Sequence, residues 1–251
     1  MENYFIYNNN TTNIPSNTSH LKTAEGFNNV LNIPSSITHL VFGSDYNQPT
    51  NDLPQSITHL TFGRDYNQPT HNLPSSITHL NFGHNYNQPA DNLPSSITHL
   101  TFGYYYNQPT NNLSNTITHL IFGWNYNQPT DHLPSSITRL AFGVSYNQPI
   151  HHLPPTITHL TFGASYNQPT HNLPSSITHL NFGVDYNQPT IFPKFITSII
   201  FFGKFERYID DLYQLYELIY TNIAMPCIVD HVDKNKHNLN MKILTLLDHC
   251  S

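Results

Sequence analysis

Apolar and polar positions alternate over a short stretch of the chain, and this stretch returns at a fixed interval. In one copy, Leu60 and Phe62 alternate with His59 and Thr61. Alternation with a period of two is typical of a strand that buries one face. We therefore predict one short strand in each copy, located at about residues 58–62 in this one.

The complete unit reads Leu-Pro-Ser-Ser-Ile-Thr-His-Leu-x-Phe-Gly-x-x-Tyr-Asn-Gln-Pro-Thr and recurs every 20 residues. The glycine of the unit falls on one grid, at Gly43, Gly63, Gly83, Gly103, Gly123, Gly143, Gly163, Gly183 and Gly203. A fixed period in this range indicates a solenoid, in which each unit buries its apolar face only by stacking on its neighbours.

The leucine-rich-repeat template can be laid on the unit, with Ile57, Leu60, Phe62 and Asp65 at its landmark positions. We predict a right-handed repeat solenoid of this type, with parallel strands about 4.8 Å apart. So short a unit leaves little room for a helix on the return path. The proline of Leu-Pro-Ser-Ser favours an extended, polyproline-like segment there instead.

The residues after the strand predict a turn. The glycine suits either a positive φ or a close approach between backbones. Two columns compete for a buried ladder that satisfies the turn backbone. The first is Asp45, Asp65, Asn85, Tyr105, Asn125, Ser145, Ser165 and Asp185. The second is uniform, with Asn47, Asn67, Asn87, Asn107, Asn127, Asn147, Asn167 and Asn187. We favour the second, since tyrosine in the first would be hard to bury and a buried amide needs several partners.

The array has different sequences at its two ends. Residues 1–30 contain a degenerate copy of the unit and predict an N-terminal cap, with repeat-like order beginning near Ile14. The repeat array itself spans 31–203. Its last unit drops one residue and gains another before it reaches the grid at Gly203, so we expect distorted packing there.

Residues 204–251 predict a helical C-terminal cap. Apolar residues recur at helical spacing over 205–219, and Pro226 prevents continuation. A second apolar periodicity at 239–247 predicts another short helix. These helices shield the last coil or, alternatively, dock to another protein.

Composition limits the partners and the compartment. Asp, Glu, Lys and Arg make up 10% of the chain, the net charge is −6, and no basic run occurs, which argues against nucleic acid. The two cysteines, Cys227 and Cys250, fit a reducing compartment. There is no signal-peptide pattern, and the apolar run at 195–202 is too short to span a membrane. We expect a monomeric, soluble, cytoplasmic protein.

The unit resembles the FNIP repeat, a leucine-rich-repeat relative found in social-amoeba proteins and in giant viruses of amoebae. The resemblance covers residues 31–203 and implies the same solenoid fold. Several members carry an N-terminal F-box, which implies substrate receptors of cullin-type ubiquitin ligases. Here the residues before the repeats lack the helical periodicity of an F-box, and the unit is about two residues shorter than is common in the family. If the chain is viral, the resemblance implies the host cytoplasm.

Histidine occupies one outward strand position in almost every unit, at His39, His59, His79, His99, His119, His159 and His179, with Arg139 as the one interruption. This column should lie on the concave face. Neighbouring imidazoles could chelate a metal, but no carboxylate or thiolate repeats beside them, so we favour a polar stacking role and predict no metal or cofactor. Like charge should lower the pKa values of these histidines and reduce stability in acid.

Variation between units indicates where a partner could bind. The most varied column follows the strand and comprises Ser44, Arg64, His84, Tyr104, Trp124, Val144, Ala164 and Val184. Tyr104, Tyr105 and Trp124 should form an aromatic patch flanked by Arg64 and His84, since Tyr, Trp and Arg dominate interface hot spots.

The repeated Ser, His and Asp form no unique constellation, so we predict no enzyme. The favoured function is a protein-binding scaffold that uses the concave face and the post-strand edge. A ubiquitin-ligase adaptor in which the C-terminal helices replace the F-box is one alternative. A structural or drifting copy without a partner and a carbohydrate-binding protein are the others.

Overall fold

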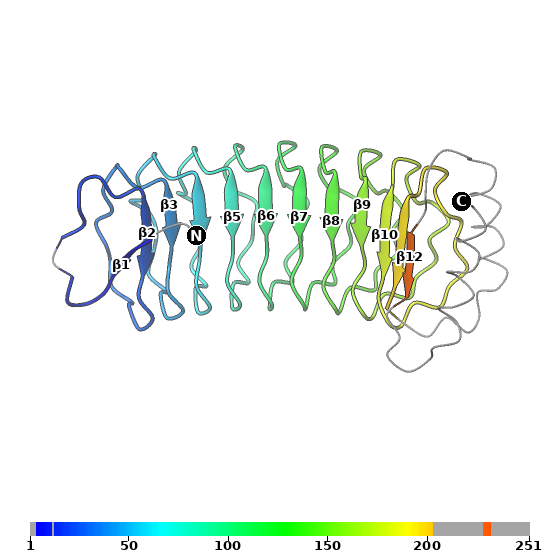
Figure 1. Cartoon of the computed structure of the whole chain (residues 1–251), viewed down its shortest axis with the longest axis horizontal. Helices are drawn as coiled ribbons and strands as arrows, with labels where there is room; N and C mark the ends of the chain where they lie inside the picture. The colour runs from blue at the N-terminus through cyan, green and yellow to red at the C-terminus, as the bar shows by residue number, and fades with distance from the viewer. Residues whose placement is uncertain (1–3, 12, 203–227, 232–251) are drawn as a thin grey trace.

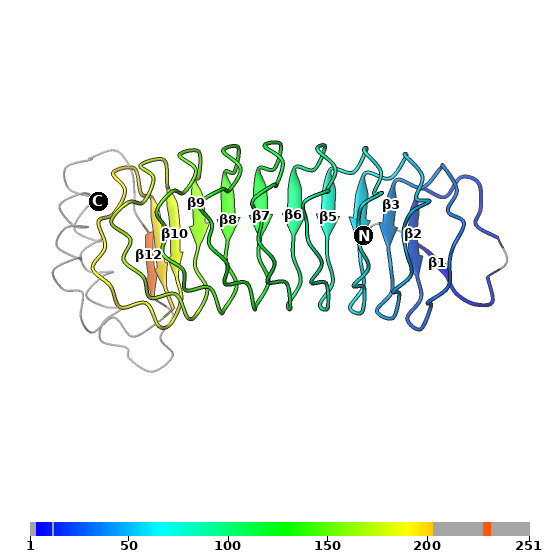
Figure 2. The same ribbon diagram turned by 180° about the vertical axis from the view of Figure 1, so that it is seen from behind.

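The computed structural model describes residues 4–11, 13–202 and 228–231. Its strands lie side by side in chain order along one elongated sheet (Figure 1), and the view from behind shows the same succession of coils (Figure 2). Every neighbouring pair is parallel. The strands are β1 (Phe5–Tyr7), β2 (His20–Thr23), β3 (His39–Val41), β4 (His59–Thr61), β5 (His79–Asn81), β6 (His99–Thr101), β7 (His119–Ile121), β8 (Arg139–Ala141), β9 (His159–Thr161), β10 (His179–Phe182), β11 (Ser198–Phe201) and β12 (Ile228–His231).

The alternation in the sequence sets the two faces of each strand. In β4, Leu60 is buried while His59 and Thr61 face outward. The predicted solenoid with one short parallel strand per coil is therefore confirmed. Over residues 13–202 the structure contains no helix, as the length of the unit led us to expect.

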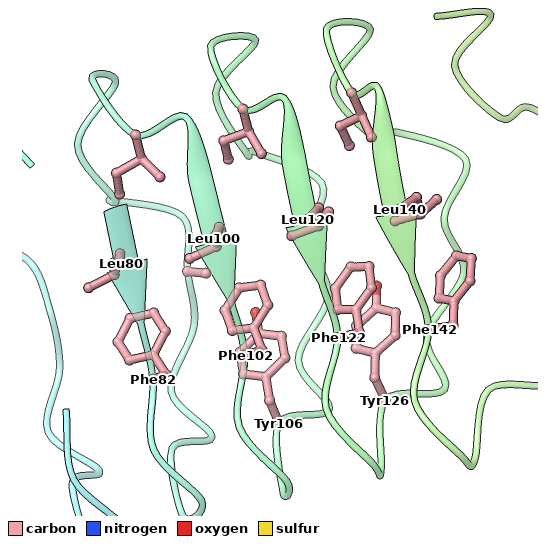
Figure 3. Close-up of a cluster of buried hydrophobic side chains, with 14 of the residues drawn as sticks. Leu80, Phe82, Leu100, Phe102, Tyr106, Leu120, Phe122, Tyr126, Leu140 and Phe142 are labelled. Carbon is pink, nitrogen blue, oxygen red and sulfur yellow. The ribbon is translucent and has the colours of Figure 1, made fainter. Parts of the chain in front are cut away.

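The interior of the solenoid is a continuous stack of apolar side chains, drawn for four coils in Figure 3. Within one coil, the rings of Phe62 and Tyr66 stack with centroids 3.7 Å apart. Phe62 then stacks on Phe82 of the next coil at 5.7 Å, and Tyr66 on Tyr86 at 6.2 Å. Each coil thus covers the apolar surface of its neighbour, which is how a unit too small for its own core becomes stable.

A column of buried hydroxyl pairs runs through this core. In five coils the threonine that follows Asn-Gln-Pro faces the tyrosine hydroxyl of the next coil. The oxygens are 2.7–3.1 Å apart in the pairs Thr50–Tyr66, Thr70–Tyr86, Thr110–Tyr126, Thr130–Tyr146 and Thr170–Tyr186. Ala90 and Ile150 replace this threonine in two coils, and the buried hydroxyls of Tyr106 and Tyr166 find no partner among the described residues.

The repeated glycine is explained by close backbone approach and not by a positive φ. A Cβ at Gly103 would lie 1.7 Å from the carbonyl oxygen of Gly83. Positive φ occurs among the described glycines at Gly26 alone, with φ of 77°. Between these glycines adjacent coils therefore stack directly through their backbones, and a side chain at Gly103 would force its coil away from the preceding one.

The uniform asparagine column forms a ladder of hydrogen bonds between coils. The backbone N–H of Asn67 donates to Oδ1 of Asn47 at 2.9 Å, and Nε2 of Gln68 donates to the same oxygen at 3.2 Å. The same backbone bond recurs at Asn87, Asn107, Asn127, Asn147, Asn167 and Asn187. The ladder begins with Asn28, whose Oδ1 accepts the N–H of Asn47. Most of these side chains are half-buried, so they satisfy the turn backbone near the surface.

Order begins earlier than Ile14, contrary to our expectation. The strand β1 pairs with β2, and the ring of Tyr7 packs edge-on against Phe27 at 5.5 Å. Aromatic side chains in the first residues thus extend the core by one further coil.

The strand register shifts by one residue before Gly203, which itself lies outside the described residues. In the pairing of β10 with β11, Phe182 faces Phe201, so Phe202 follows in register with Gly183. The last unit is one residue short, and pairing of Leu180 with Ile199 keeps the apolar residues inside. The turn of the last unit is kept, since the Ile196 N–H donates to the carbonyl oxygen of Pro193 as in earlier units.

The predicted helices at 205–219 and 239–247 lie outside the described residues. The strand β12 falls between them and pairs with β11. The β-branched residues Ile228 and Val229 follow Pro226 closely and suit an extended strand. Within the described part of the chain, no helix has the length and apolar character to cross a membrane.

Candidate functional site

The histidines form a stacked column on the outer face of the sheet. The rings of His39, His59, His79, His99 and His119 lie parallel, with neighbouring centroids 4.1–4.2 Å apart. His20 extends the column, stacking on His39 at 4.1 Å. The sequence column omits it because β2 pairs with β3 at a spacing of 19 residues, His20 opposite His39. His159 and His179 form a separate stack at 4.1 Å, beyond the exposed Arg139.

A threonine hydroxyl fixes the orientation of most of these rings. In the coil of His59, the Thr58 hydroxyl donates to the carbonyl oxygen of Thr38 at 3.3 Å and lies 2.9 Å from Nδ1 of His59. The short contact at Nδ1 holds the His59 ring in its stacked orientation.

Three histidines of the column resist protonation. Partial burial lowers the pKa of His79, and the charges of His99 and His39 lower it further. Burial and the neighbouring charges, including that of Arg139, also lower the pKa values of His119 and His159. These three imidazoles are therefore mostly neutral at pH 7.

The geometry of the column favours stacking over chelation. Neighbouring rings are 12–18° from parallel, so their outward nitrogens point in nearly the same direction and do not converge. A metal such as zinc needs ligand nitrogens at about 2.0–2.1 Å that point at one ion. Among the described residues, no group of three or more His, Cys, Asp or Glu side chains is placed to hold a metal.

Four side chains after the strands of three consecutive coils form an aromatic cluster, which we define as His84, Tyr104, Tyr105 and Trp124. Tyr104 stacks on His84 at 4.6 Å and on Trp124 at 5.2 Å. Tyr105 contacts Tyr104 and His84 edge-on, both at 4.9 Å. Tyr105 is 47% exposed and Trp124 46%. These predicted residues therefore lie together on the surface, at the edge of the solenoid that follows the strands.

The two arginines in the predicted site lie on different surfaces. Arg64 is exposed at the equivalent position one coil before His84. Arg139 is exposed on the outer face of the sheet, where it takes the place of a histidine. The chain therefore offers two separate candidate surfaces, the sheet face and the post-strand edge.

The sequence matches the FNIP Repeat family in overlapping stretches at residues 27–65, 49–71, 66–105, 86–114, 106–143, 130–165, 146–185 and 166–205. This chain belongs to the FNIP repeat family. The FNIP array is also similar to the crystal structure of CroV588, described as a novel circular LRR protein, at 46% sequence identity and a TM-score of 0.71. The similarity covers 75% of this chain and 31% of CroV588. No curated protein gives a significant match.

An FNIP solenoid of this kind is a leucine-rich-repeat-like fold, a fold that is typically noncatalytic and suited to protein interaction. The repeated scaffold fixes where side chains stand, and the variable positions decide what they can contact. In this chain the largest departure from uniformity on the post-strand edge is the aromatic cluster.

Proposed function

We propose that this FNIP repeat chain is a noncatalytic scaffold that binds another protein through the post-strand edge and the outer face of the sheet. The observation that carries the proposal is the exposed aromatic cluster. Tyrosine and tryptophan are enriched in interface hot spots because they combine large apolar area with a polar group.

The cluster is already ordered by its own ring contacts. Tyr104 is held between His84 and Trp124, so a partner would immobilise few additional rotamers on binding. Stacking occupies the faces of the inner rings and leaves ring edges and polar atoms for contact.

The proposal includes a monomer that acts in the cytoplasm and binds neither nucleic acid nor membrane. The balance of 9 Lys and Arg against 15 Asp and Glu supports a protein partner, because phosphate-rich ligands need clustered cations.

The test is affinity capture from an amoebal lysate followed by binding measurements with the purified captured protein. Tyr104→Ala with Trp124→Ala should weaken binding by about thirtyfold or more, the loss typical of a hot spot. The matched control is Val184→Ala, which removes an exposed side chain from the same column several coils away. Circular dichroism establishes that each variant is folded. Equal binding by the aromatic variant and the control would refute the proposal.

A further inference from the structure

The outer face of the sheet has a charge pattern unlike that of the whole chain. Two columns point outward from β2 to β11. The first contains the eight histidines of the two stacks, Arg139 and Ser198, and the second contains Lys22, Val41, Thr61, Asn81, Thr101, Ile121, Ala141, Thr161, Asn181 and Ile200. Neither column includes an Asp or Glu, although the chain has 15 acidic and 9 basic residues.

Arg139 is the fixed positive charge in the middle of this face. Its neighbours in the first column are His119 on β7 and His159 on β9. The adjacent outward positions of the second column hold Ile121, Ala141 and Thr161, none of which titrates. No ion pair joins the Arg139 guanidinium to any residue that the structure describes.

The turns that follow the strands near Arg139 also lack carboxylates. Asn125, Ser145 and Ser165 occupy a turn position that carries aspartate in coils closer to the two ends, namely at Asp45, Asp65 and Asp185. The outward strand positions and this turn position around Arg139 therefore carry no carboxylate. A guanidinium group is suited to bidentate pairing with a carboxylate.

We propose that the sheet face around Arg139 binds an extended acidic peptide segment of a protein partner, with one of its carboxylates paired to Arg139. This inference rests on the proposed function and adds the chemistry of the partner and a second contact surface. Fixed cations on this face are few and separated, at Lys22 and Arg139, whereas nucleic acid requires a cluster of them. A single carboxylate, in contrast, can be bound by one arginine through two parallel hydrogen bonds.

The flanking histidines make this binding depend on pH. A carboxylate held at Arg139 lies beside His119 and His159 and favours their charged forms. Binding therefore takes up protons and becomes tighter as the pH falls toward about 6.

Fluorescence anisotropy of a labelled peptide of alternating glutamate and serine tests the inference, with the same peptide carrying glutamine for glutamate as the comparison. At low salt the intact chain should bind the glutamate peptide about tenfold tighter than the glutamine peptide, and Arg139→Gln should remove most of this difference. Arg64→Gln, which removes an exposed arginine from the post-strand edge, should leave it unchanged. Binding should tighten several-fold between about pH 7.5 and about pH 6, and less in a His119→Gln, His159→Gln variant.

Equal affinity for the two peptides, or equal losses in Arg139→Gln and Arg64→Gln, would overturn the inference. Tighter binding of a single-stranded DNA oligonucleotide than of the glutamate peptide would also overturn it. The Tyr104→Ala, Trp124→Ala variant should bind the peptide normally. If the intact chain does not bind the peptide, but the aromatic variant still loses binding of the captured protein, the proposed function stands and this inference is refuted.

Discussion

The Tyr106 hydroxyl is buried without a hydrogen-bond partner because Ala90 stands where neighbouring coils have threonine. In the next coil, Thr110 lies 2.9 Å from the hydroxyl of Tyr126 across the same interval of 16 residues. Burial raises the pKa of Tyr126 to about 12, partly offset by its bond to Thr110. Burial and neighbouring tyrosines raise the pKa of Tyr106 without any such offset. Ala90→Thr should therefore supply the missing partner in a geometry that the fold already uses.

The expected gain follows from two contributions. An unpaired buried hydroxyl costs about 1–3 kcal/mol, and a typical hydrogen bond contributes about 0.5–1.5 kcal/mol net. Because these overlap, we expect Ala90→Thr to raise the free energy of unfolding by about 1–2 kcal/mol. Tyr106→Phe should be neutral or stabilising, since it removes an unpaired group. Tyr126→Phe should lose about 1–2 kcal/mol, because it leaves Thr110 unpaired.

Urea unfolding followed by circular dichroism measures these differences as midpoint shifts at constant slope. The double variant Ala90→Thr, Tyr106→Phe serves as the control, because the new threonine then has no hydroxyl to bond and the gain should disappear. The reasoning is refuted if Ala90→Thr is less stable than the parent chain, or if the double variant keeps the whole gain.

Two further predictions concern the glycine and histidine columns. Gly103→Ala should lower the melting temperature by at least about 6 °C, because its Cβ would lie 1.7 Å from the backbone oxygen of Gly83, which cannot rotate away; a shift of less than about two degrees in circular dichroism would contradict this. The urea midpoint should fall as the pH is lowered through 6.5, the ordinary pKa of histidine. The reason is that the pKa of His79 is lowered in the folded state, so the unfolded chain binds more protons in this pH range. His79→Gln should flatten that dependence between about pH 7.5 and about pH 5, and an unchanged slope would count against it.

The repeated interior could be predicted from sequence because each residue type meets the same type in the next coil. Leu60 and Phe62 define the buried face of their strand, and the next copies repeat the assignment with Leu80 and Phe82. The aromatic patch could be placed for the same reason, since a fixed period puts Tyr104 beside Trp124. Periodicity thus converts spacing along the chain into contact in space.

Features that break the period or depend on interatomic distances could not be predicted in the same way. The register at the ends is decided by strand pairing. The pairing of β10 with β11 places Phe202 opposite Gly183, where the 20-residue period would place Gly203. His20 belongs to the degenerate N-terminal copy of the unit, but its place in the histidine stack depends on a spacing of 19 residues between His20 and His39. The unpaired hydroxyl of Tyr106 requires knowledge that residue 90 faces it, which the unit sequence alone does not reveal.

Because of the asparagine ladder, neighbouring coils contact each other through the same hydrogen bonds along the array. Asn67 bonds to Asn47 in the same way that Asn127 bonds to Asn107. Recombination that deletes or duplicates one whole unit in the gene would therefore join two surfaces that already fit each other. Each unit gained would lengthen the molecule by about 4.8 Å without requiring any compensating substitution. Evolution can in this way change the reach of the protein, and which variable side chains stand next to one another, while leaving its folding unaffected.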